Sequence, residues 1–235
     1  MPSNDEAAIG ILMLESRFPR VPGDIGNPGT WPFPVRFKVV ANASPDRVVH
    51  QRAEGLLEDF IFAGQELIDE GVSAITTSCG FLSLFQQELA SSLSVPVMTS
   101  SLMQVELINR MMPNGKIAGI LTIAASSLSK DHLLHARVPE GTPIGTTEGG
   151  REFTRVILND ETSLDIELAR QDNIEAAVKF KSDHPELGAI VLECTNMTPY
   201  AKDIARETGL PVFNIETLVT WIHSGLSPRE FNVTG

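Results

Sequence analysis

The chain has 235 residues, which is enough for one large domain or two small ones, each with its own core. A formal net charge of −12 without any Lys/Arg-rich run excludes a protein that binds the phosphate backbone of nucleic acids. No uninterrupted apolar stretch reaches the roughly 18 residues of a membrane span. Residues 1–8 lack the features of a secretory signal peptide, and two cysteines make no disulfide framework, so we expect a cytoplasmic protein with reduced thiols.

Apolar runs alternate with helix signals in the N-terminal part of the chain, which predicts a parallel sheet covered by helices. The predicted strands cover residues 8–14, 35–39, 72–77 and 95–98. Ser44-Pro45 has the sequence of a helix start, and this helix is expected to continue to Gly71. Ser83 opens a capping-box pattern, and Ser100 is placed to cap the helix after the fourth strand.

A long loop is predicted at residues 16–34, which contain five Pro and three Gly. Loops of this length inside compact domains are usually functional. Trp31 and Phe33 would either line a lid over a site or pack the loop against the domain, and packing is the favoured interpretation.

The same pattern begins again at Gly115. Strands are predicted at 117–122, 189–192 and 211–213, helices at 163–182, from Thr198 onward and up to Gly225, and a loop at 140–150. A shift of 115 residues, without a gap, places Cys79 on Cys194. The same shift aligns further pairs: Ala74-Ile75 with Ala189-Ile190, Ser83 with Thr198, Phe85 with Tyr200, Ala90 with Ala205, and Pro96-Val97 with Pro211-Val212. This internal repeat predicts two halves of one design, with both sulfurs facing one cleft.

Each cysteine follows a predicted strand and precedes a helix signal. Ligands of parallel α/β sheets bind beyond the carboxyl ends of the strands, and the positive end of a helix there favours a thiolate. Two thiols across a cleft would supply the base and the acid that a racemase needs on opposite faces of an α-carbon. The alternative for either cysteine alone is a small buried apolar side chain. A metal site is disfavoured, because there is no C-x-x-C pair and His132 with His135 lacks a third ligand.

At these cysteines the chain resembles the aspartate/glutamate racemase superfamily, whose members and relatives include hydantoin racemases, maleate isomerase and arylmalonate decarboxylase. The matching residues are Ser16, Ser78-Cys79-Gly80, Thr122 and Glu193-Cys194-Thr195-Asn196. The resemblance implies an α/β fold of two pseudosymmetric flavodoxin-like halves, each a parallel sheet flanked by helices, with the site in the cleft between them. Residues 1–103 plus 214–235 would form the first half and residues 104–213 the second.

The resemblance also implies that no cofactor is used, that Cys79 and Cys194 are the catalytic acid and base, and that the partner is a small-molecule carboxylate. It assigns substrate binding to Ser16, Ser78, Gly80, Thr122, Thr195 and Asn196. Alternatives remain: Thr195 would bond a carboxylate or its own backbone, Asn196 would contact substrate or stabilise its turn, and Gly80 would serve only by its backbone freedom. Glu193 would raise the pKa of Cys194 by like charge or point away from it.

Both cysteine segments depart from those of glutamate racemases: Cys79-Gly80-Phe81 replaces Cys-Asn-Thr, and Glu193-Cys194-Thr195-Asn196 replaces Gly-Cys-Thr-His. We predict a cofactor-independent isomerase of amino-acid metabolism, a racemase or epimerase of an acidic amino acid or hydantoin-like carboxylate. The alternatives are a decarboxylase, lyase or cis–trans isomerase on the same scaffold, and a binding protein without catalysis. The acidic charge and the apolar helix faces are compatible with a homodimer or a higher homo-oligomer.

Overall fold

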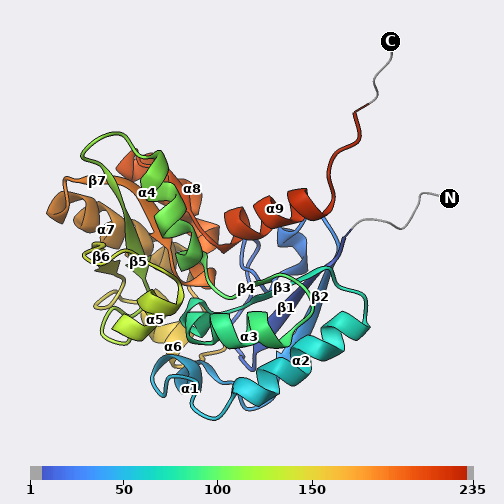
Figure 1. Ribbon diagram of the computed structural model, residues 1–235. Coiled ribbons are helices and arrows are strands. Elements are labelled where there is room, and N and C mark those ends of the chain that lie inside the picture. Colours follow the sequence, from blue (N-terminus) through green and yellow to red (C-terminus); the bar gives the residue numbers. More distant parts are fainter. Residues whose placement is uncertain (1–6, 232–235) are drawn as a thin grey trace.

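Two four-stranded parallel sheets, one from each half of the chain, form the frame of the molecule (Figure 1). The computed structural model describes residues 7–231. The first sheet has the order β2-β1-β3-β4 and the second the order β6-β5-β7-β8, with helices packed around both. In chain order the strands are β1 (Ile9–Leu14), β2 (Val35–Val40), β3 (Ala74–Thr77), β4 (Val97–Met98), β5 (Ile117–Thr122), β6 (Ile144–Thr146), β7 (Leu187–Leu192) and β8 (Val212–Phe213). This is the α/β architecture that the sequence predicted.

The central strands β1 and β3 are buried along their whole length because both faces of the sheet are covered. All six residues of β1 are buried. Since side chains alternate along a strand, Ile9 and Ile11 pack on one face with the last helix, while Leu12 packs on the other face in the main core.

Nine α-helices lie among the described residues, together with four short 3₁₀ segments. The α-helices are α1 (Pro45–Val49), α2 (Leu57–Asp69), α3 (Gln86–Ser92), α4 (Val105–Met111), α5 (Lys130–His135), α6 (Phe153–Leu158), α7 (Ile166–Asp183), α8 (Ala201–Thr208) and α9 (Ile215–Leu226). The 3₁₀ segments are η1 (Pro28–Thr30), η2 (Gly80–Phe85), η3 (Ser101–Gln104) and η4 (Thr195–Tyr200). Between residues 7 and 231, no helix is both long enough and apolar enough to cross a membrane.

The long helix predicted from Ser44 to Gly71 is wrong, because the structure has two helices there. Ser44 does cap a helix, since its hydroxyl accepts from the backbone N–H of Arg47. That helix, α1, ends after little more than a turn, and the chain then reverses through Arg52 and Ala53, which both have positive φ. The left-handed conformation of these two residues breaks the helical path.

The helix starts predicted at Ser83 and Thr198 also fall too early. In both halves a 3₁₀ turn follows the cysteine, and the α-helix begins only at Gln86 or Ala201. The hydroxyls of Ser83 and Thr198 are buried without a hydrogen-bond partner, so neither caps a helix. By contrast, the Ser100 hydroxyl accepts from the N–H of Leu102 at the start of η3, as predicted.

The internal repeat is visible in the strand register. β3 pairs with β4 through Ile75 and Val97, and β7 pairs with β8 through Ile190 and Val212, each position 115 residues further along. Segments η2 and η4 begin and end at positions related by the same shift. The structure differs from the sequence prediction at β6, which forms inside the segment predicted to be a loop at residues 140–150.

The last helix, α9, returns to the first sheet. Its residues Ile215, Leu218 and Val219 share an apolar cluster with Ile9 and Ile11 of β1. The division into 1–103 plus 214–235 and 104–213 stays a prediction, and its ends at 1–6 and 232–235 lie outside the described residues.

Candidate active site

The carboxyl ends of β3 and β7 deliver one cysteine each to the junction of the two halves. Cys79 is the residue before η2, and Cys194 is the residue before η4. Both line one cavity of about 20 Å³, a space that holds roughly one water molecule. The other lining residues come from both halves: Leu14, Phe18, Pro45, Val49, Ser78, Phe81, Ile123, Ile157, Leu158, Glu193 and Asn196. The walls must therefore move apart to admit a substrate of several heavy atoms.

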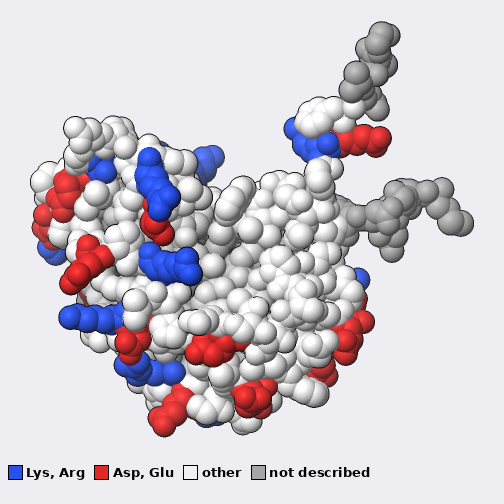
Figure 2. Space-filling view, viewed as in Figure 1, with Lys and Arg blue, Asp and Glu red and all other residues white. Residues whose placement is uncertain are grey.

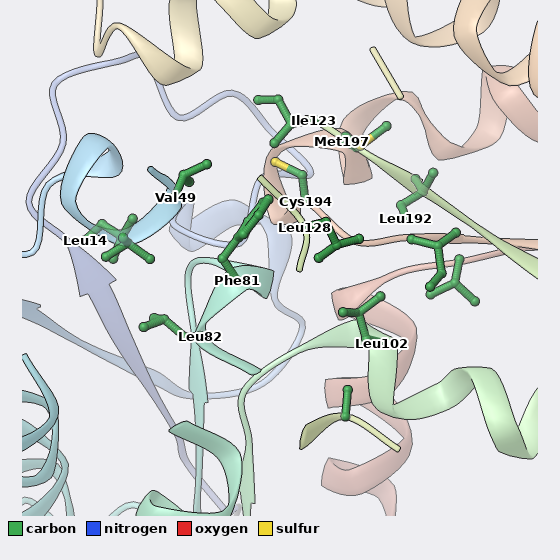
Figure 3. Close-up of a cluster of buried hydrophobic side chains, with 14 of the residues drawn as sticks. Leu14, Val49, Phe81, Leu82, Leu102, Ile123, Leu128, Leu192, Cys194 and Met197 are labelled. Atoms are coloured by element: carbon green, nitrogen blue, oxygen red, sulfur yellow. The ribbon is translucent and has the colours of Figure 1, made fainter. Parts of the chain in front are cut away.

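The surroundings of the two thiols are mostly apolar. Figure 3 shows Phe81 of the first half beside Ile123 and Cys194 of the second, inside one cluster of buried side chains. Burial is the main reason why the pKa of Cys79 rises to about 12 and that of Cys194 rises well above its ordinary value. The prediction that helix N-termini would favour the thiolate is thus wrong for this cavity, because desolvation outweighs the backbone N–H groups of η2 and η4.

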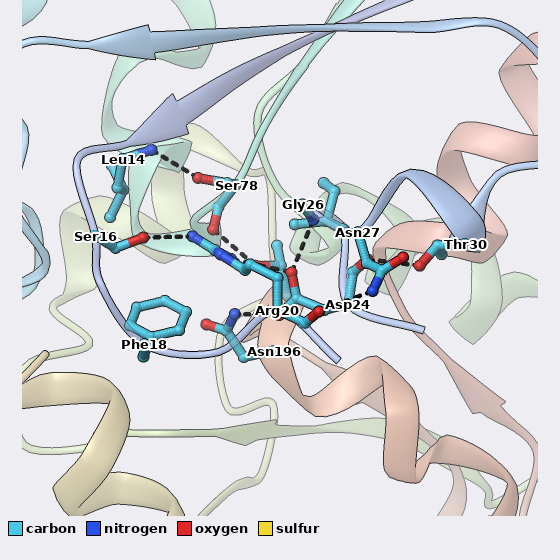
Figure 4. Close-up of polar contacts among 12 residues, drawn as sticks. Leu14, Ser16, Phe18, Arg20, Asp24, Gly26, Asn27, Thr30, Ser78 and Asn196 are labelled. Atoms are coloured by element: carbon cyan, nitrogen blue, oxygen red, sulfur yellow. Dashed lines mark hydrogen bonds and ion pairs between the residues drawn. The ribbon is translucent and has the colours of Figure 1, made fainter. Parts of the chain in front are cut away.

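The Pro/Gly-rich loop, whose Phe18 lines the cavity, contains an ion pair (Figure 4). The Arg20 guanidinium donates to Asp24 Oδ1 at 3.1 Å and to Ser16 Oγ at 2.9 Å, and it lies 4.3 Å from the centre of the Phe18 ring. Asp24 is 2% exposed. The loop also contacts the second half, since the backbone N–H of Arg17 donates to Asp160.

Asp24 connects this loop to the second cysteine. Its Oδ2 accepts from Asn196 Nδ2 at 2.5 Å, and the amide oxygen of Asn196 accepts from Cys194 Sγ at 3.5 Å. Because the carboxylate engages the NH₂ group, the oxygen of the amide is the atom that faces the sulfur. The contact therefore favours the protonated thiol of Cys194.

Glu193 is a buried carboxyl group in the same wall. It is 0% exposed, its Oε2 accepts from the Thr122 hydroxyl at 2.7 Å, and its Oε1 has no hydrogen-bond partner among residues 7–231. Burial raises the pKa of Glu193 to about 7 despite the Thr122 hydrogen bond, which lowers it. Its charge raises the pKa of both thiols, so of the two sequence alternatives it acts on Cys194 rather than pointing away.

Gly80 allows Glu193 to approach. A Cβ at position 80 would lie 2.3 Å from both the backbone oxygen and Oε1 of Glu193, closer than any real Cβ contact. Gly80 does not have positive φ, so the requirement for glycine comes from space and not from backbone freedom.

Two predicted residues, Ser78 and Thr195, use their polar groups to join segments. Ser78 Oγ accepts from the N–H of Leu14 at 2.8 Å, and the Ser78 carbonyl accepts from the Thr195 hydroxyl at 2.7 Å. Of the predicted set, Cys79, Ser78, Cys194 and Asn196 line the cavity, whereas Ser16, Gly80, Thr122 and Thr195 do not. Substrate binding by these residues stays a prediction.

Sequence reasoning missed Phe18, Arg20 and Asp24. The available signal was a pair of opposite charges four residues apart inside a loop otherwise rich in Pro and Gly. Trp31 and Phe33 pack as favoured: both are 8% exposed and lie in the apolar cluster under α9, away from the thiols. Among residues 7–231 no three His, Cys, Asp or Glu side chains are grouped to hold a metal ion.

No family model matches the chain. Its fold is that of the aspartate/glutamate racemase superfamily, as the sequence resemblance predicted. Unliganded arylmalonate decarboxylase superposes with a TM-score of 0.60 at 13% identity, covering 96% of this chain and 94% of that one. Aspartate racemase from Picrophilus torridus gives 0.59 at 12% identity, covering 96% of each chain, and allantoin racemase from Klebsiella pneumoniae gives 0.57 at 15%, covering 97% and 96%.

The curated relatives have a different activity from the predicted racemase. The chain is 27% identical over 224 residues to a dimethylsulfoniopropionate lyase of Durusdinium sp. clade D, covering 91% of this chain and 73% of the relative. It is similar to dimethylsulfoniopropionate lyases 5 and 6 of Emiliania huxleyi, at 26% and 27% identity over 92% and 91% of this chain. The chain spans only 45% and 60% of the length of these two proteins.

The prediction of an isomerase, a racemase of amino-acid metabolism, is wrong. The curated relatives are lyases, and the racemases share only the scaffold, at 12–15% identity. The error has a physical source: two thiols in one cavity provide acid–base groups, but the substrate decides which bond breaks after the proton is removed.

Proposed function

We propose that the chain is a lyase of a small carboxylate that carries a leaving group on its β-carbon, with dimethylsulfoniopropionate as the substrate to test first. The observation that carries this proposal is the similarity, over nine-tenths of the chain, to proteins with that activity. The two-thiol cavity supports it, because such a cleavage needs a base and no cofactor.

The chemistry follows from the substrate's structure. Dimethylsulfoniopropionate has a carboxylate, an α-carbon with protons and a cationic dimethylsulfonio group on the β-carbon. A thiolate takes one α-proton and becomes a thiol. The electron pair of the broken C–H bond forms the C=C bond, and the C–S bond breaks with its pair remaining on sulfur. The products are dimethyl sulfide and acrylate.

Cys79 is the better candidate for the base. The positive charge of Arg20 lowers the pKa of Cys79, whereas the negative charge of Asp24 raises that of Cys194. In addition, Cys194 donates its thiol hydrogen to Asn196. A buried thiolate needs a nearby cation, and the sulfonium group of the substrate would supply one inside the cavity. The aromatic rings of Phe18 and Phe81 suit a soft methylated cation.

The test is direct. The purified chain is incubated with dimethylsulfoniopropionate; dimethyl sulfide is measured in the headspace and acrylate by proton NMR. Both products should appear in equal amounts, and Cys79→Ser should abolish them. Absence of both products from the wild-type chain would reject the substrate. Release of carbon dioxide from a malonate-type acid would favour decarboxylation instead.

The cellular and assembly predictions belong to the same proposal. Both cysteines are free, in keeping with a reducing cytoplasm.

Exposed apolar side chains on α4 and α5, namely Leu107, Met111 and Leu134, support a homodimer or higher homo-oligomer. On the face shown in Figure 2, charged side chains are sparse over the central part of the first half. A sedimentation experiment that finds only a 25.5 kDa species would contradict self-association.

A further inference from the structure

Among the residues that line the cavity, Glu193 is the only acidic one. The elimination described above gives it no role. It is the residue before Cys194, and its Oε1 lies against the backbone of Gly80, the residue after Cys79. Its carboxyl group is therefore held between the two thiol-bearing segments. Of the loop's ion pair, Arg20 lowers the pKa of Cys79 and Asp24 raises the pKa of Cys194.

The contacts of its two oxygens are unequal. Oε2 accepts the Thr122 hydroxyl hydrogen, whereas Oε1 is buried and has no partner. A carboxylic acid carries its proton on one oxygen, and the oxygen that already accepts a hydrogen bond is the poorer place for it. The neutral form of Glu193 therefore presents an Oε1–H donor. A buried donor without an acceptor is costly, so it favours a ligand that brings an acceptor.

We propose that Glu193 is a catalytic residue that acts as a neutral carboxylic acid, whose Oε1–H donates to the carboxylate of the substrate and to the charge that builds there as the α-proton leaves. This inference rests on the proposed function, because it takes the substrate to be a small carboxylate.

Charge balance in the cavity supports the neutral form. The reacting complex contains the substrate carboxylate and one thiolate, and Arg20 is already paired with Asp24. A third negative charge on Glu193 would repel both. A neutral acid avoids this repulsion and supplies a donor fixed in a dry site, where a donor aimed at developing charge has its largest effect. Buried carboxylic acids that stay neutral in order to donate are an established catalytic device.

The binding of propionate tests the donor separately from catalysis. Propionate is the substrate without its dimethylsulfonio group, and it cannot be cleaved. The donor is present below the pKa of Glu193, which is about 7, and is lost above it. Affinity for propionate, measured by calorimetry or ligand-observed NMR, should therefore fall about tenfold for each pH unit above 7 in the wild-type chain.

Two variants separate a donor from a nearby charge. Glu193→Gln keeps the shape, a donor and an acceptor for Thr122, so its propionate affinity should match the wild type at low pH and not fall at high pH. Glu193→Met removes both charge and donor, so it should bind weakly at every pH. With dimethylsulfoniopropionate below pH 7, Glu193→Gln should stay within about tenfold of wild-type kcat, and Glu193→Met should lose about 100-fold or more. Glu148→Gln, which removes an exposed carboxylate of the same half, should bind propionate like the wild type.

Each outcome separates the two proposals. Equal losses in Glu193→Gln and Glu193→Met, or propionate binding independent of pH in the wild type, would overturn the donor role, whether or not the chain releases dimethyl sulfide. Propionate binding that weakens above pH 7 and is rescued in Glu193→Gln, without any release of dimethyl sulfide, would support the donor and reject the proposed lyase. Because binding is measured on the folded chain, a variant that fails to turn over substrate still reports on the donor.

Discussion

The two cysteine-bearing segments have the same order of elements and different surroundings. Both run from a strand through a cysteine and a 3₁₀ turn into an α-helix, at positions 115 residues apart. Cys79 is followed by Gly80 and lies within the influence of Arg20, whereas Cys194 is preceded by Glu193 and bonded to Asn196. The repeat thus brings two thiols to one cavity but does not make them chemically equal. Such inequality suits a reaction that needs one base, as in an elimination, better than one that swaps base and acid.

Replacing each sulfur by oxygen tests most directly whether Cys79 and Cys194 have different roles. Serine keeps the size of cysteine and raises the pKa of the group far above that of a thiol. If Cys79 is the base, Cys79→Ser should lower kcat for release of dimethyl sulfide by about 1,000-fold or more. Cys194→Ser should lose about 10- to 100-fold, because it keeps a hydroxyl donor toward Asn196. Initial rates by headspace gas chromatography decide this, and the reverse order of losses would assign the base to Cys194.

The second comparison concerns the positions after the two cysteines, Gly80 and Thr195. In Gly80→Ala the new methyl group would meet the backbone oxygen and Oε1 of Glu193, so one of the two segments has to shift. We expect a loss of about 1–3 kcal/mol in the free energy of unfolding and a clear loss of activity. Urea unfolding measures the first quantity. Gly225→Ala is the matched control, since a Cβ there meets nothing within 4 Å and should leave both stability and activity unimpaired. A stable, fully active Gly80→Ala would show that the close approach of Glu193 has no role.

The sequence was sufficient to predict the scaffold because parallel strands leave strong local signals. The apolar runs of the central strands, the repeated Cys and Pro positions and the Ser100 cap are all short-range features. The reaction was not predictable in this way, because the repeat indicates only what the two halves share, the cysteine in each. The differences were visible when Ser78 is aligned with Glu193 and Gly80 with Thr195, but their meaning depends on burial.

Burial is a property of the assembled halves, which is why the thiol pKa values were predicted in the wrong direction. The backbone N–H groups of η2 and η4 are encoded locally, whereas the apolar side chains that surround both sulfurs come from segments far apart in the chain. The same applies to the contact between Asp24 and Asn196, which are separated by 172 residues. No spacing rule in the sequence indicates that contact.

The smallest expected effect concerns the pKa of Glu193, which depends on its neighbour Thr122 in the second half. Thr122 stabilises the charged form of Glu193, because its hydroxyl donates to Oε2. Thr122→Val removes that donor, so the pKa of Glu193 should rise above about 7, and the pH at which propionate affinity begins to fall should move upward by up to about one unit. The direction of the shift follows because a carboxyl group that loses a hydrogen bond to its ionised form keeps its proton to higher pH.

Thr76→Val is the control. It also removes a buried hydroxyl, which donates to the carbonyl of Met98, and it leaves the surroundings of Glu193 unchanged. Both variants should lose about 1 kcal/mol of stability for the missing hydrogen bond, but only Thr122→Val should shift the binding curve. A shift toward lower pH, or equal shifts in the two variants, would contradict the assignment of the Glu193 proton to Oε1.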